Sequence, residues 1–293
     1  MSYVIPAPAQ VSVSVVGRRE RFPVGRIYCV GRNYVEHAKE MGFTGREPPF
    51  FFIKPADCCL VVEAGQTGQL HYPPLTKDFQ HEIELVACIG TGGKNIKAAH
   101  AKKHIYGNAV VLDMKRRDLQ GEQKKLGRPW CIGKAFDHSA PIGPITPAAQ
   151  AGDVNHAEIY LQVGGQDRHR SHVSKLIWNI AETIEHLSAA WELQPGDVIY
   201  TGTPDAVAAV VSGDTAAAGR TQRAATVSDV VVVQTAPPRS GVAHDAGAAQ
   251  FGADRAQEHP AARPDVGGRS VPVAPTARGL PPPPAPAAPA ATT

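Results

Sequence analysis

Residues 81–89 read HEIELVACI, and charged and apolar side chains alternate at the start of this run. Side chains two positions apart lie on the same face of a β-strand, so Glu82 and Glu84 share one face while Ile83 and Leu85 share the other. Two carboxylates on one face repel each other unless a positive charge lies between them. The stretch therefore predicts a strand whose charged face either is solvated or holds a hard cation.

A third carboxylate follows the next apolar run, where Asp113 comes directly after Val110-Val111-Leu112. If the two predicted strands are neighbours, Asp113 lies beside Glu82 and Glu84. Three carboxylates leave about half of an octahedral shell open to water or substrate, which is typical of a catalytic Mg²⁺ or Mn²⁺ site. The run is not the zinc motif HExxH, because Leu85 stands where the second histidine would be.

His37 and Glu40 lie three positions apart in a predicted short helix over residues 34–41, so their side chains are neighbours. A carboxylate beside an imidazole raises its basicity and fixes its tautomer, as a general base acting on water requires. A histidine–glutamate pair on the protein surface is the commoner explanation of the same spacing. The pair is therefore a candidate base only in combination with other site residues.

Two lysines occur in apolar surroundings. Lys134 lies between Trp130 and Phe136, and Lys54 follows the apolar residues Phe51-Phe52-Ile53. A buried ammonium group is unfavourable unless it meets an anion, so a substrate carboxylate or enolate is a natural partner for Lys134. Lys54 invites the same argument, although an ordinary lysine at the end of a strand is the simpler explanation.

Composition excludes several classes of protein. The 293-residue chain has 30 basic and 27 acidic residues, and its basic residues form no stripe of the kind that nucleic-acid binding requires. No apolar run approaches the ~20 residues that span a bilayer. The five cysteines form no CxxC pair. We therefore expect a cytoplasmic protein without a disulfide framework, a nucleic-acid partner or a membrane span.

The composition changes sharply near residue 214. Residues 215–293 contain no Lys, Ile, Asn, Met, Cys, Trp or Tyr, and Ala, Pro, Gly, Arg and Val dominate. Such a segment buries too little apolar surface to offset its ordering entropy, so we predict a disordered tail. The exception is Val227–Val233, a β-prone run that could pair with the edge of a sheet. A shift of reading frame in the gene would also produce this composition.

The predicted organisation therefore has three parts. Residues 1–20 form an N-terminal strand segment, residues 21–214 form a catalytic domain, and residues 215–293 form the tail.

Taken together, the ordered set of motifs resembles the fumarylacetoacetate hydrolase superfamily over roughly residues 20–214. The similarity is greatest to the branch that contains fumarylpyruvate hydrolases and acylpyruvases. The matching pieces are Gly31-Arg32-Asn33-Tyr34 with His37 and Glu40, Lys54-Pro55, His81-Glu82-Ile83-Glu84-Leu85, Asp113, Arg117-Asp118-Leu119-Gln120, Gly127-Arg128-Pro129-Trp130, Gly133-Lys134-Ala135-Phe136, Pro195-Gly196-Asp197 and Thr201-Gly202-Thr203-Pro204.

The resemblance implies a strand-rich α+β fold of the mixed β-roll type, a homodimer, and Mg²⁺ or Mn²⁺ on Glu82, Glu84 and Asp113. It also implies hydrolysis of a carbon–carbon bond in a small 2,4-diketo acid, with fumarylpyruvate of the gentisate pathway for aromatic catabolism as the expected substrate. The implied catalytic residues are His37, Glu40, Lys134 and Gln120, and the implied substrate-binding residues are Arg32, Lys54, Arg117 and Thr203.

Other activities fit the same residues. A metal site beside enolate-stabilising groups also serves an acylpyruvase, an oxaloacetate decarboxylase or a 2-keto acid isomerase. The His37–Glu40 pair favours hydrolysis, because activation of water needs a base. A ligand-binding protein without activity, or an inactive product of a truncated or frameshifted gene, is the remaining alternative.

Overall fold

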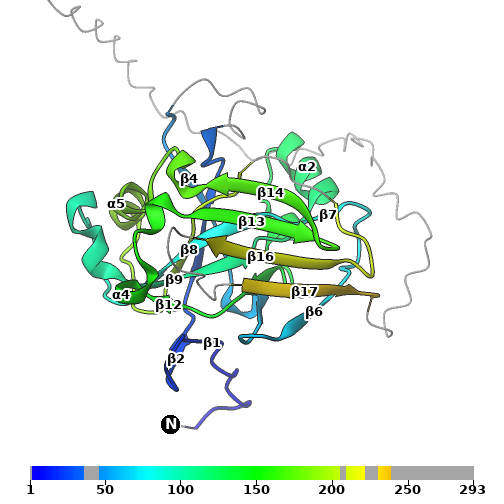
Figure 1. Ribbon diagram of the computed structural model, residues 1–293, viewed down its shortest axis with the longest axis horizontal. Coiled ribbons are helices and arrows are strands. Elements are labelled where there is room, and N and C mark those ends of the chain that lie inside the picture. The colour runs from blue at the N-terminus through cyan, green and yellow to red at the C-terminus, as the bar shows by residue number, and fades with distance from the viewer. Residues whose placement is uncertain (1, 36–45, 205–208, 222–229, 239–293) are drawn as a thin grey trace, which may run out of the picture. The chain divides into compact units, whose positions relative to one another are not determined.

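The computed structural model describes residues 2–35, 46–204, 209–221 and 230–238 (Figure 1). Its largest element is an eight-stranded mixed sheet, in which seven strands form a continuous path and β12 (Thr146–Pro147) pairs with one of them off that path. In spatial order the seven are β4 (Phe50–Lys54), β3 (Ile27–Gly31), β15 (Val198–Tyr200), β8 (Ile83–Ile89), β9 (Ile105–Leu112), β11 (Ala140–Ile142) and β5 (Cys59–Val61).

Strand β8 lies near the middle of this sheet and pairs antiparallel with β9 in the register Ile83↔Leu112 and Glu84↔Val111. All seven of its residues are buried. Ile83 and Leu85 pack into one apolar cluster, and Val86 packs into another on the opposite face. The predicted alternation is confirmed, but the solvated charged face is not, because both faces of β8 are covered.

A second, five-stranded sheet covers the Ile83 and Leu85 face. Its strands in spatial order are β14 (Gln166–His172), β13 (Glu158–Val163), β16 (Thr215–Thr221), β17 (Val230–Ala236) and β6 (Thr67–His71). In Figure 1 β13, β16 and β17 cross in front of β8 and β9. Ile159, Ala218 and Val233 from the second sheet share one core with Ile83 and Leu85 from the first. The predicted strand-rich α+β class is confirmed.

The remaining described strands form two separate two-stranded sheets. The hairpin of β1 (Ser12–Ser14) and β2 (Arg21–Pro23) places Val13 and Phe22 in the cluster that contains Val86. Strand β7 (Phe79–Gln80) pairs with β10 (Lys115–Arg116). Because β1 pairs with β2, the predicted boundary at residue 20 cuts through one hairpin and does not separate two structural units.

The described helices are short. They are α2 (Arg117–Lys125), α3 (Cys131–Lys134), α4 (Ala148–Ala151) and α5 (Ile180–Ala190), with the 3₁₀ turns η1 (Ala56–Cys58), η2 (Ala98–His104), η3 (Val154–His156) and η4 (Val173–Lys175). A capping box begins α5, in which Asn179 Oδ1 accepts from the Glu182 N–H at 3.0 Å and Glu182 Oε2 accepts from the Asn179 N–H at 3.0 Å. Within the described ranges, no helix has the length and apolar character that crossing a bilayer requires.

The prediction that ordered structure ends at residue 214 is wrong. Strand β16 pairs with β13, and β17 lies between β16 and β6, so both are internal strands of the second sheet. Strand β16 was not expected, because its alanine-rich sequence has little β-propensity of its own. Gly219 is required in β16 because a Cβ atom there would lie 2.5 Å from the Tyr160 hydroxyl. The part of the predicted β-prone run Val227–Val233 that lies within β17 does form a strand, but between two other strands and not at an edge.

We expect Val233→Asp to reduce the free energy of unfolding by at least about 3 kcal/mol, because Val233 is 1% exposed and an aspartate there would bury an unpaired charge. The neighbouring Gln234 points to solvent, so Gln234→Asp is the matched control and should change stability by less than about 0.5 kcal/mol. Urea unfolding of both variants tests whether β17 is part of the cooperative fold. Equal losses, or no loss in Val233→Asp, would contradict it.

Candidate active site

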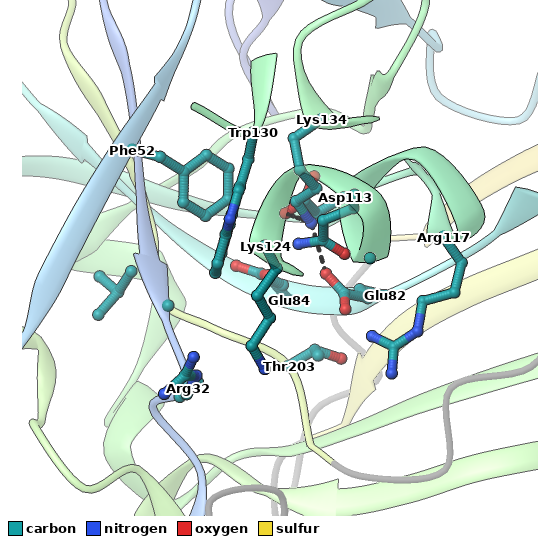
Figure 2. Close-up of a pocket in the computed structure, with 14 residues that line it drawn as sticks. Arg32, Phe52, Glu82, Glu84, Asp113, Arg117, Lys124, Trp130, Lys134 and Thr203 are labelled. Atoms are coloured by element: carbon teal, nitrogen blue, oxygen red, sulfur yellow. Dashed lines mark hydrogen bonds and ion pairs between the residues drawn. The ribbon is translucent and has the colours of Figure 1, made fainter. Parts of the chain in front are cut away.

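A cavity of about 140 Å³ opens over the carboxylate cluster (Figure 2). Glu82, Glu84 and Asp113 line it together with residues from α2, from α3 and the segment before it, from β4, from the end of β3 and from the segment after β15. These are Val30, Gly31, Arg32, Phe52, Arg117, Gln120, Gly121, Lys124, Trp130, Lys134 and Thr203.

Pairing of β8 with β9 brings the three carboxylates together. The Asp113 N–H donates to the Glu82 carbonyl at 2.7 Å, directly beyond the paired ends of the two strands. One oxygen atom from each of Glu82, Glu84 and Asp113 lies within 4.8 Å of the others. The prediction that Asp113 lies beside Glu82 and Glu84 is therefore confirmed.

Three buried lysines surround this cluster. Lys134 Nζ lies 2.6 Å from Glu82 Oε2 and 2.5 Å from Asp113 Oδ2. Lys115 Nζ lies 2.5 Å from Glu82 Oε1, and Lys54 Nζ lies 2.7 Å from Asp113 Oδ1. Breaking one of these pairs would leave an uncompensated buried charge, so the lysines hold two of the carboxylates in place.

The pKa shifts follow from this arrangement. Burial would raise the pKa of Glu82, but the ammonium groups of Lys115 and Lys134 outweigh it and hold that pKa below its usual range. Burial would lower the pKa of Lys134, but Asp113 and Glu82 outweigh it and raise that pKa. Both residues are therefore charged at neutral pH.

Glu84 is in a different position from the other two carboxylates. It accepts a hydrogen bond from the Gly202 N–H at 2.7 Å, and it forms no ion pair with any described residue. Burial, followed by repulsion from Asp113 and Glu82, raises the pKa of Glu84 well above its usual value. A hard divalent cation would supply the missing positive charge, and three carboxylates are the donor set that Mg²⁺ or Mn²⁺ prefers. The residues present fit such a metal.

A close approach of α2 and α3 brings two further polar side chains into the cavity. Gly133 allows this approach, because a Cβ atom there would lie 2.7 Å from the Gln120 backbone nitrogen. The contact brings Gln120 on α2 and Lys134 on α3 into one cavity. The two residues predicted to stabilise an oxyanion therefore lie together, with Lys134 also bound to the carboxylates.

Arg32 enters the cavity from the end of β3 in an unusual backbone conformation. Its φ is 57°, in the left-handed region that residues other than glycine rarely adopt. A Cβ atom on the preceding Gly31 would lie 2.0 Å from Phe50, whose ring stands 5.3 Å from the Arg32 guanidinium carbon. Phe50 also meets the Trp130 ring edge-on, with centroids 5.4 Å apart. This aromatic stack fixes the place of Arg32.

Asn33 connects the end of β3 to the segment that carries Thr203. Its side-chain amide donates to the Thr201 carbonyl at 2.8 Å and to the Trp178 carbonyl at 2.9 Å. Its oxygen accepts from the Trp178 N–H at 2.8 Å. Thr203 is thereby held at the wall of the cavity that Arg32 also lines; binding of substrate by these two residues stays a prediction.

The structure separates one predicted residue from the cavity. Lys54 is completely buried behind Asp113, where it also donates to the Ser139 carbonyl at 2.8 Å, and it does not line the cavity. Lys54 therefore contacts the Asp113 carboxylate and not, as expected, the substrate. His37 and Glu40, the predicted base and its partner, lie outside the described residues.

Two charged residues of the cavity or the carboxylate cluster were not predicted from the sequence. Lys115 follows Asp113 with one apolar residue between them, and this alternation could have placed both on one face. Lys124 lies seven positions after Arg117, which is two turns along one helical face.

Comparison with known proteins agrees with this geometry. The profile of the family described as fumarylacetoacetate (FAA) hydrolase C-terminal matches residues 26–243. A crystal structure of fumarylpyruvate hydrolase from Pseudomonas aeruginosa in complex with Mn²⁺ and pyruvate is 49% identical, with a TM-score of 0.76. The similarity covers 80% of this chain and all of that one.

Among curated relatives, a fumarylpyruvate hydrolase from a Ralstonia species is 45% identical over 168 residues, which span 57% of this chain and 85% of the relative. An oxaloacetate tautomerase from Escherichia coli is 38% identical over 194 residues, which span 66% of this chain and 87% of the relative. The likeness in fold confirms the mixed β-roll, and the extent of the family match shows that this chain belongs to the fumarylacetoacetate hydrolase family.

Proposed function

We propose that the protein hydrolyses a carbon–carbon bond in a 2,4-diketo acid, with fumarylpyruvate as its substrate and fumarate and pyruvate as products. The observation that carries the proposal is the buried cluster of Glu82, Glu84 and Asp113 in one cavity with Lys134 and Gln120. The 49% identity to a fumarylpyruvate hydrolase supports the choice of substrate.

Glu82, Glu84 and Asp113 are the residues that would hold Mg²⁺ or Mn²⁺. When bound, such an ion polarises a carbonyl and helps to orient a keto acid through its oxygens. Lys54 and Lys115 lie against the outer oxygens of Asp113 and Glu82, so they act as positioning residues for these two carboxylates.

Bond cleavage would proceed by addition of water to the 4-keto carbon, which puts negative charge on its oxygen. The bond between carbons 3 and 4 then breaks, its electron pair leaves on carbon 3 as the enolate of pyruvate, and a proton completes the product. Gln120 and Lys134 both line the cavity, and we assign to Gln120 donation to the first oxyanion and to Lys134 stabilisation of the enolate. Arg32, Arg117 and Thr203 are proposed to bind substrate oxygens.

A base must remove a proton from the attacking water, and His37 oriented by Glu40 is proposed for this role. Tautomerisation or decarboxylation of oxaloacetate is the second candidate function, because an oxaloacetate tautomerase shares 38% identity with this chain. Those reactions need the enolate-stabilising groups but no attacking water. The homodimer implied by the resemblance stays a prediction.

The primary test is an ultraviolet assay of the purified full chain with fumarylpyruvate, acetylpyruvate and oxaloacetate, with Mn²⁺ and after chelation. We expect loss of fumarylpyruvate with Mn²⁺ and at least a ~100-fold lower rate after chelation, because the substrate then lacks the ion that would polarise its carbonyl and orient it. Glu84→Gln should cause a comparable loss, whereas Glu122→Gln, on the exposed side of α2, should not. Full activity after complete chelation would overturn the metal assignment, and turnover of oxaloacetate alone would favour the second function.

A second test concerns His37. We expect His37→Ala to reduce hydrolysis of fumarylpyruvate by roughly 100-fold, the usual contribution of a positioned base, and to leave oxaloacetate turnover nearly unchanged. His100→Ala, on the exposed turn η2, is the matched control and should alter neither rate. Equal losses for both substrates would show that His37 does not act as the base for water.

A further inference from the structure

One face of α2 carries cations toward the cavity. Arg117, Gln120 and Lys124 fall at intervals of three and four residues, which places them on the same side of the helix. All three line the cavity, and so does Arg32 from the end of β3. In Figure 2 Arg32, Lys124 and Arg117 lie on the Thr203 side of the carboxylates, whereas Lys134 enters from the opposite side.

Lys124 and Arg117 differ from the buried lysines in what they contact. Lys115 and Lys134 are bound to Glu82, but neither Lys124 nor Arg117 forms an ion pair with any residue in the described part of the chain. Partial burial and the nearby charges of Arg32 and Arg117 lower the pKa of Lys124, so both arginines lie close enough to Lys124 to repel it. An anion bound between them would relieve this repulsion.

The balance of charge in the cavity favours a substrate with two negative charges. Four cationic side chains and three carboxylates line it, so a bound divalent metal leaves a surplus of three positive charges. A keto acid with a single carboxylate removes only one of them. A second carboxylate at the far end of the acyl group would remove another, on the side where Arg32, Arg117 and Lys124 lie.

We propose that Arg32, Arg117 and Lys124 form a subsite for the second carboxylate of a dicarboxylic substrate, with Lys124 as the specificity-determining residue. The reaction step rests on the proposed function, but recognition of the second carboxylate can be measured without turnover. Arg32 is fixed by its backbone and by Phe50, and Arg117 begins α2 with its N–H bonded to the Asp78 carbonyl at 2.8 Å. Lys124 has the flexible stem that can close on an anion.

The test compares fumarate with crotonate, which has a methyl group in place of one carboxylate. Calorimetry on the full chain saturated with Mn²⁺ should show an affinity for fumarate about tenfold higher than the affinity for crotonate. A gain of this size is what one hydrogen bond to a charged group contributes to binding. Lys124→Met should remove this preference and leave crotonate binding within about twofold. Methionine keeps the helix propensity of lysine, so α2 should be retained. Lys125→Met is the matched control, because Lys125 is exposed and does not line the cavity.

The same variants are then assayed with fumarylpyruvate and acetylpyruvate. Lys124→Met should lower kcat/KM for fumarylpyruvate about tenfold and leave acetylpyruvate unchanged. Equal effects on both members of each pair, or no effect on fumarate, would overturn the subsite. The wild-type chain could hydrolyse neither acylpyruvate and still bind fumarate more tightly than crotonate, with Lys124→Met losing that preference. In that case the proposed reaction fails and the subsite stands.

Discussion

The rest of the site depends on one constraint, the close approach of three carboxylates. One oxygen atom from each lies within 4.8 Å of the others beside β8, a strand that is buried on both faces. Like charges this close cannot all remain ionised in a dry interior without compensation. The chain provides it with ammonium groups placed by different elements: Lys54 ends β4, Lys115 lies in β10 and Lys134 ends α3. The positions of these elements and of the carboxylates are therefore coupled.

The compensation is unequal, and this inequality gives the site its chemistry. Lys54 and Lys115 each contact one carboxylate from outside the cavity, whereas Lys134 lies inside it between Glu82 and Asp113. Among the residues that the structure describes, Glu84 has only the hydrogen bond from the Gly202 N–H. A divalent cation would complete the charge balance at Glu84 and reduce the hold of the carboxylates on Lys134. The lysine could then interact with a developing oxyanion, which is the role proposed for it.

The local alternation in residues 81–89 was sufficient to predict the shared face of Glu82 and Glu84, and the position of Asp113 followed from adjacency of two strands. The sequence could not predict that the Lys54 side chain points to Asp113 and away from the cavity, because this depends on the pairing of β3 with β4 and on the position of Ser139 behind Asp113. Strand β16 was missed and β17 was expected only as pairing with a sheet edge, because the stability of both strands comes from neighbours distant in sequence. Averaged composition carries no information about such pairing.

The central claim is that Glu82, Glu84 and Asp113 bind one divalent ion in competition with Lys134. Anomalous diffraction from crystals of the full chain grown with Mn²⁺ tests it most directly. We expect one strong manganese peak among the three carboxylates, with the Lys134 ammonium group moved away from Glu82 and Asp113. Absence of a peak there at saturating Mn²⁺, with both Lys134 ion pairs intact, would contradict the account.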